Sequence, residues 1–176
     1  MSNNQNFWLR AATGIDALNE RIGKATSWLT LVLVVLVAVD VVIRYLFSDS
    51  KVWITELQWH LFALIFLLGA GYAFRHDRHV RVDLFYSKFN ERDKAMVDFA
   101  GNLLFLIPWC CIVGWFAFFF ALDSFQISET SADAGGLPAR YLIKSAIAVG
   151  IFLLLLQSIA QVIRAGMILF KVKLEG

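Results

Sequence analysis

The chain has 176 residues, of which 59% are hydrophobic and 17% charged, and its mean hydropathy is +0.66. A typical soluble domain is about half apolar and about a quarter charged, so this composition excludes an ordinary water-soluble domain and an intrinsically disordered chain. The formal net charge is only +2, which argues against nucleic acid as a partner. These values favour a protein whose main solvent is the lipid bilayer.

Four apolar stretches are each long enough to cross the hydrocarbon core of a bilayer, which takes about 20 helical residues. None of them carries the polar stripe that is typical of a helix in a soluble bundle. The sequence therefore predicts a single all-α integral membrane domain over residues 1–176, with four transmembrane helices at about 26–47, 52–74, 99–122 and 142–163.

The segment ahead of the first span has a helical pattern of its own. Its apolar residues recur at alternating spacings of three and four, and charged residues occupy the other faces. The apolar positions are Trp8, Ala11, Ile15, Leu18 and Ile22. This pattern is typical of an N-terminal amphipathic helix that lies along the membrane interface, although a tail helix packed on partner loops would show it equally.

Lysine and arginine are distributed unevenly around the four spans. The N-terminal segment, the connection between spans two and three, and the C-terminal end together hold 12 of them. The other connections hold Lys51, Arg140 and Lys144. Because cytoplasmic loops are enriched in these residues, we expect both termini on the cytoplasmic side.

Three local features shape the connections and the third span. Residues 123–141 contain serines, threonines and a Gly-Gly-Leu-Pro turn, which are typical of an irregular surface loop. Asn90, which precedes two acidic residues, is expected to cap the third helix. Pro108 is expected to kink that helix near the middle of the membrane.

The first span contains Asp40 and Arg44, four residues apart and hence on one helical face, where an ion pair forms readily. A charge inside a span is costly and suggests a function by default, here a proton or sodium relay. We prefer a pair that fixes packing against another helix, because a single pair without further buried carboxylates makes a poor ion pathway.

Glu56 and His60 repeat this spacing at the start of the second span. They could bond each other or a partner subunit, and ion coordination is a weaker alternative. Haem ligation by two histidines requires them to face each other at similar depth. The remaining histidines, His76 and His79, lie in the basic connection between spans two and three, so we expect neither haem nor a metal site.

Small and amide residues indicate faces for helix association. Gly69 and Gly150 each stand four residues from an alanine, a spacing that lets helices approach closely. Gln157 and Gln161 share one face of span four and can form hydrogen bonds between helices. The sequence contains no phosphate-binding glycine loop, zinc motif or plausible catalytic triad, so we expect no enzymatic activity.

A series of short motifs extends from the end of the first span into the basic connection. It consists of Arg44-Tyr45, Trp53-Ile54-Thr55-Glu56-Leu57, Gly69-Ala70, Arg75 and His79-Val80-Arg81-Val82-Asp83. In order and spacing the series resembles the small membrane subunit (DctQ-like) of tripartite ATP-independent periplasmic (TRAP) transporters. The four-span plan extends this resemblance over nearly the whole chain. Thr55 departs from the family pattern, which often carries a second acid at this position.

The resemblance implies a small, non-catalytic scaffold subunit in the bacterial inner membrane. In such transporters a periplasmic substrate-binding protein delivers an organic acid to the membrane complex. A large membrane subunit carries the substrate and sodium sites and moves as an elevator. We therefore expect this chain to form an obligate heterodimer with the large subunit, in contact with membrane lipids, and to bind no cofactor itself, while the complex uses the sodium gradient.

The motifs and the polar residues inside the spans together give a set of structural or partner-contact candidates. They are Asp40, Arg44, Trp53, Glu56, His60, Gly69, Arg75, His79, Arg81 and Asp83. Surfaces around residues 51–53 and 123–141 are candidates for docking the binding protein. Two alternatives are a membrane-anchor or cytochrome-like subunit of a redox complex and a self-sufficient exporter that uses Asp40 as its coupling acid.

Overall fold

The structure is a computed structural model that describes residues 3–76 and 89–172, and it describes side chains for 7–76 and 89–170. Its elements are α1 (Asn3–Phe47), α2 (Val52–Arg75), α4 (Glu91–Gly101), the π-helical segment η1 (Asn102–Leu106), α5 (Ile107–Gln126) and α6 (Tyr141–Val172). Four continuous helical stretches are long and apolar enough to cross a membrane. The predicted all-α membrane fold is therefore confirmed.

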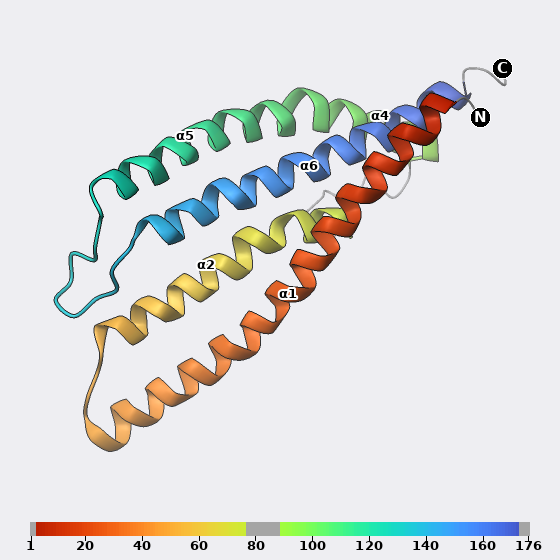
Figure 1. Cartoon of the computed structure of the whole chain (residues 1–176). Helices are drawn as coiled ribbons and strands as arrows, with labels where there is room; N and C mark the ends of the chain where they lie inside the picture. Colours follow the sequence, from red (N-terminus) through yellow and green to blue (C-terminus); the bar gives the residue numbers. More distant parts are fainter. Residues whose placement is uncertain (1–2, 77–88, 173–176) are drawn as a thin grey trace.

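The helices lie side by side in the order α5, α6, α2 and α1, and they spread apart away from the end where both termini lie (Figure 1). α6 is the central helix, because it packs against α5, α2 and α1. In its most apolar window 44% of the residues are buried, compared with 6–11% for the other spans. Large apolar side chains of α1 and α5 consequently remain exposed, as expected of faces that contact lipid or another membrane protein.

The N-terminal amphipathic segment is continuous with the first span. α1 is one helix of 45 residues, about 67 Å long at 1.5 Å per residue, which is more than twice the hydrocarbon thickness. Glycine favours a break in a helix, but α1 continues as a helix through Gly23. A Cβ on Gly23 would lie 2.3 Å from Cγ of Tyr72, so glycine at this position permits close packing of α1 on α2.

The buried face of α1 repeats every seven residues, and we call it the α1 seam. Its members are Ala12, Asn19, Thr26, Leu33 and Asp40, of which Leu33 is partly buried and the others are buried. A seven-residue repeat keeps one face of a helix against its neighbour over a long distance, as in left-handed coiled coils. Three of the five members are polar, so a search for hydrophobic periodicity alone does not identify this face.

The third span contains the irregularity expected near Pro108. The side chain of Asn90 caps its start by accepting a hydrogen bond from the Asp93 N–H at 2.8 Å, as predicted. Directly before Pro108 the chain forms η1, in which the N–H of Ile107 bonds to the carbonyl of Asn102, five residues back. Proline has no N–H to donate to the preceding turn, and a wider turn accommodates the missing bond. The chain changes direction where α4 passes into α5 (Figure 1).

Two glycines bring α2 and α6 close together, and only one of them was expected. A Cβ on Gly150 would lie 2.6 Å from the carbonyl oxygen of Leu67, which confirms the close approach at this position. By contrast, a Cβ on Gly69 would meet nothing within 4 Å in the described part of the chain. Gly71, which points about 200° away from Gly69 around the helix, lies between α1 and α6: a Cβ there would lie 2.2 Å from Oδ1 of Asn19 and 3.2 Å from the Leu153 carbonyl oxygen.

Candidate functional site

Two groups of hydrogen-bonded residues lie at opposite ends of α2 in the described part of the chain. The loop cluster lies at the start of α2 and consists of Glu56, Ser131, Leu137 and Arg140. The three-helix cluster lies at the end of α2 and consists of Asp16, Asn19, Glu20, Arg75, His76, Gln157 and Arg164.

Glu56 is the centre of the loop cluster. It is only 4% exposed, although it lies near the start of its helix. Its Oε1 atom accepts hydrogen bonds from the Arg140 guanidinium at 2.8 Å and from the Ser131 hydroxyl at 2.5 Å. Its Oε2 atom accepts a bond from the backbone N–H of Leu137 at 2.5 Å. Three donors from the connection between α5 and α6 thus converge on one carboxylate of α2.

This connection, residues 127–140, is closed by its own backbone hydrogen bonds. The N–H of Arg140 bonds to the Glu129 carbonyl at 2.9 Å, and the N–H of Ser131 bonds to the Leu137 carbonyl at 3.1 Å. Gly136 permits the approach to α2, since a Cβ there would lie 2.8 Å from Oε2 of Glu56. The expectation of an irregular loop is correct for its secondary structure, but the loop is internally bonded and fixed to a helix.

Further contacts brace the base of the loop. The guanidinium carbon of Arg140 lies 5.4 Å from the ring centroid of Trp59, a cation–π distance. Lys144, in the first turn of α6, forms an ion pair with Glu129, and its ammonium lies 4.0 Å from the ring centroid of Phe120. The hydrogen bond from Lys144 is the main cause that holds the pKa of the Glu129 carboxyl below its usual range.

His60 does not join the loop cluster. Its Nδ1 lies 2.5 Å from the backbone carbonyl oxygen of Glu56, and its ring centroid lies 3.8 Å from that of Trp59. The carboxylate of Glu56 is therefore directed to the loop and not to His60. Trp53, one turn before these residues, is 44% exposed at the same end of the molecule.

The three-helix cluster joins α1 to α2 and α6 through two acids and two arginines. Arg75 donates to the Glu20 carboxylate at 2.6 Å and to the backbone carbonyl of Asp16 at 2.9 Å. Arg164 of α6 pairs with the Asp16 carboxylate. His76 Nε2 lies 2.9 Å from Oε2 of Glu20. Of these residues, sequence reasoning selected Arg75 alone as a contact residue.

Two buried amides complete this cluster. The side-chain N–H of Asn19 donates to Oε1 of Gln157 at 2.9 Å, and Nε2 of Gln157 donates to Asp16 Oδ1 at 2.9 Å. Both amide side chains are at most 1% exposed. The interhelical role predicted for Gln157 is thus confirmed. In the same segment of α1 the apolar Trp8 and Leu18 are 53% and 41% exposed, whereas the polar Asp16, Asn19 and Glu20 are turned towards the protein.

The predicted ion pair inside the first span is present. Arg44 donates to Oδ2 of Asp40 at 2.6 Å. The Asp40 side chain is 3% exposed and that of Arg44 is 54% exposed, so the pair reaches from a buried position on the α1 seam to the surface. Among the other motif residues, His79, Arg81 and Asp83 lie outside the described residues.

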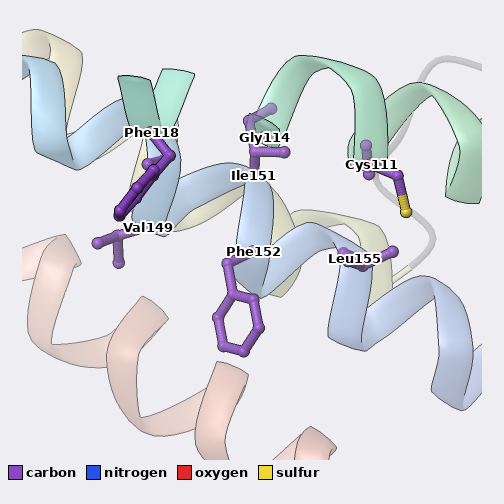
Figure 2. A pocket seen from close by; sticks show the side chains of 9 residues that line it. Cys111, Gly114, Phe118, Val149, Ile151, Phe152 and Leu155 are labelled. Carbon is purple, nitrogen blue, oxygen red and sulfur yellow. The ribbon is translucent and has the colours of Figure 1, made fainter. Parts of the chain in front are cut away.

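An apolar groove of about 380 Å³ lies between α5 and α6. Figure 2 shows Phe118 and Val149 at one end of it, Cys111 and Leu155 at the other, and Phe152 between them. These side chains offer no charged group to an anionic ligand. In residues 3–76 and 89–172, no three His, Cys, Asp or Glu side chains are grouped so that they could hold a metal ion.

Comparisons with known proteins identify chains to which this one is similar. The family model described as "Tripartite ATP-independent periplasmic transporters, DctQ component" matches residues 33–166. A Haemophilus influenzae protein, provisionally named a TRAP transporter small permease protein, is 31% identical over 108 residues. This alignment covers 59% of the chain and 62% of the relative, so the chain spans about three fifths of that relative's length. The matched range of the family model contains the whole loop cluster, but not the α1 residues of the three-helix cluster.

Proposed function

Because the chain belongs to the DctQ-component family of tripartite ATP-independent periplasmic (TRAP) transporters, we propose that it is the scaffold subunit of a sodium-coupled importer of an organic acid. As a small permease subunit it is a multi-pass membrane protein and a transporter component. In the proposed complex it binds a large membrane subunit, and a periplasmic binding protein supplies the substrate. Sodium and substrate are bound by the other components, and this chain carries out no catalysis.

One observation carries the scaffold role, namely where the charged side chains are directed. A binding site for an organic acid needs a cation that is free to pair with a carboxylate. Arg75 and Arg164 are already paired with Glu20 and Asp16, and Arg140 is paired with Glu56. The groove between α5 and α6 is apolar. These cations therefore hold helices and a loop of this chain together, which supports a structural role.

The proposed orientation places both termini in the cytoplasm and the loop cluster in the periplasm. The uneven distribution of Lys and Arg supports it. The start of α1 and the end of α6 lie at the same end of the molecule, as an even number of spans requires (Figure 1). On this orientation the 127–140 connection and exposed Trp53 face the periplasm of a bacterial inner membrane, where they are available to the binding protein.

The proposal is tested by uptake of radiolabelled organic acids into proteoliposomes. This chain, the large subunit and the binding protein are reconstituted together and then with each component omitted in turn, under a sodium gradient and under a matched potassium gradient. We expect uptake only from the complete mixture with sodium. Sodium-driven uptake by this chain alone would contradict the proposal and favour the exporter alternative.

The redox-complex alternative is not favoured by the family match. An absorption spectrum of the purified complex distinguishes it directly from the transporter. A Soret band that copurifies with this chain would support a cytochrome-like subunit. A spectrum without such a band, together with uptake in the complete mixture, is the result that we expect.

A further inference from the structure

Five buried side-chain polar atoms have no hydrogen-bond partner in the described part of the chain, and two of them lie near the connected ends of α1 and α2. These two are Oδ1 of Asp40 on α1 and Nε2 of Gln58 on α2. Asp40 is 2% exposed, and its other carboxylate oxygen is occupied by Arg44. The Asp40 atom is an acceptor and the Gln58 atom is a donor, so the two groups are chemically complementary.

The two residues lie at the same level of the hairpin formed by α1 and α2. Asp40 comes seven residues before the end of α1 at Phe47, and Gln58 comes six residues after the start of α2 at Val52. Contacts at the far end of the hairpin keep this register to within about one helical turn, because Gly23 packs on Tyr72. The two side chains are therefore separated along the helices by no more than about one turn.

Both side chains also point into the same contact. Asp40 belongs to the α1 seam, and in its half of α1 the neighbouring helix is α2 (Figure 1). On α2, Gln58, Ile65 and Tyr72 stand at seven-residue intervals and hence on one face. Tyr72 contacts Gly23 of α1, so this face of α2 is the one that packs on α1. The opposite face carries Leu67, which contacts α6.

We propose that a hydrogen bond, made directly or through one buried water, joins Asp40 Oδ1 to Gln58 Nε2 across the interface between α1 and α2. Buried donors and acceptors are normally satisfied, and a bridging water is nearly as favourable as a direct bond. A polar pair between two helices is satisfied in one register only, so this contact adds to the Arg75–Glu20 pair at the other end of the hairpin in fixing how α1 and α2 lie against each other. It also holds the carboxylate that orients the half-exposed Arg44.

The sign of a stability change tests this contact in the full-length subunit purified in detergent. Gln58→Leu would leave Asp40 Oδ1 without its partner, so we expect the Tm to fall by about 2–6 °C. If Gln58 Nε2 instead has no partner, the same variant removes a buried unsatisfied donor and the Tm stays or rises, which would overturn the proposal. Gln58→Asn shortens the side chain by one carbon, so a direct bond predicts as large a fall as with leucine and a water bridge predicts a smaller one.

A double variant separates this contact from a general effect of Gln58. In the background Asp40→Ala with Arg44→Ala, the fall caused by Gln58→Leu should disappear, and an undiminished fall would refute the contact. Thr26→Val is the matched control, because the Thr26 hydroxyl on the same seam bonds to the Ile22 carbonyl of its own helix, at 2.7 Å. We expect Thr26→Val to change the Tm by the same amount in the parent protein and in the Asp40→Ala, Arg44→Ala background.

Disulfide cross-linking measures the register of α1 against α2 even if the double variant does not fold. In a chain with Cys110 and Cys111 replaced by alanine, cysteines that replace Leu33 and Ile65 lie one heptad from the proposed contact on each helix. Oxidation should link this pair efficiently, and Gln58→Leu should reduce the yield by about half or more. A yield that is unchanged by Gln58→Leu would show that the register does not depend on the contact.

Discussion

The loop cluster and the three-helix cluster use similar residues to stabilise different parts of the fold. In the loop cluster one carboxylate, Glu56, collects three donors that lie within ten residues of one another in the chain. In the three-helix cluster the two acids are on α1, and their partners are on α2 and α6. The first arrangement fixes the shape of one connection, whereas the second fixes how three long helices cross.

The difference also lies in how many contacts depend on one residue. Removing the Glu56 carboxylate would leave Ser131, Leu137 and Arg140 without their shared acceptor. Removing Asp16 would still leave α1 tied to α2 through Glu20 and Arg75. The loop cluster is therefore vulnerable at a single position, whereas the three-helix cluster is redundant.

The largest expected effect is all-or-none and tests whether the two clusters lie on opposite sides of the membrane. Single cysteines replace exposed Ala132, in the loop, and exposed Arg92, in the first turn of α4, in a chain with Cys110 and Cys111 replaced. In intact cells with a permeable outer membrane, an impermeant maleimide should label the loop cysteine and not the other. Detergent should make both reactive, and equal labelling of both before detergent would contradict the four-span topology.

The next largest effect is expected from Glu56→Leu. The variant leaves the guanidinium of Arg140 and the Leu137 N–H without their acceptor, and we expect the Tm in detergent to fall by about 5–10 °C. The 127–140 connection should also become sensitive to proteases. Glu91→Leu is the control, because Glu91 is 86% exposed and pairs with Lys94 on its own helix. Equal Tm values for the two variants would contradict the central role of Glu56.

Part of the all-helical fold and of its polar contacts could be predicted from the sequence, and the rest could not, for physical reasons. Glu56, Asp40 and Arg44 were identifiable because a charge in an apolar span is costly and needs a partner. Spacing on one helix predicted the pair of Asp40 with Arg44, because helical geometry alone places residues four apart together. The partners of Glu56 depend instead on how a loop folds back, which residue spacing does not encode.

The backbone of the loop shows why its partners were missed. Ser128 and Ala139 have positive φ angles of 49° and 60°, which residues other than glycine rarely adopt. These turns bring Arg140 back over the start of α2, and no residue preference predicts them. One feature of the sequence did point to Arg140, because it is a lone arginine in a mildly acidic connection. The Asn19–Gln157 contact was missed because it requires the crossing of α1 over α6, which no local pattern specifies.

A smaller effect is expected in the three-helix cluster. Asp16→Ala removes the partner of Arg164 and one acceptor of Gln157, and we expect a loss of about 1–3 kcal/mol in the free energy of unfolding. Arg164→Leu in the same background should add little, since the two residues act together. Thermal unfolding of the two single variants and the double variant measures this coupling. Additive losses would show that Asp16 and Arg164 act independently.

The smallest effect is expected at Glu129, at the edge of the loop cluster. The pKa of its carboxyl is held below the ordinary value, mainly by the hydrogen bond from Lys144. A lowered pKa in the folded protein means that the stabilisation is present at and above the ordinary pKa and is lost as the pH falls through the folded value. At neutral pH, Glu129→Gln should therefore lower the Tm by about 1–2 °C, as expected of one partly exposed ion pair.

The pH dependence of this difference separates the ion pair from simple packing. Below the ordinary pKa of about 4.5, the parent carboxyl progressively takes up a proton, and the Tm values of the parent and Glu129→Gln should converge. The difference between the two proteins isolates Glu129 from other carboxyls that titrate in the same range. Asp123→Asn, at the exposed end of α5, is the control for a neighbouring acid. A difference for Glu129→Gln that persists unchanged into strong acid would mean that the side chain acts through its shape and not through its charge.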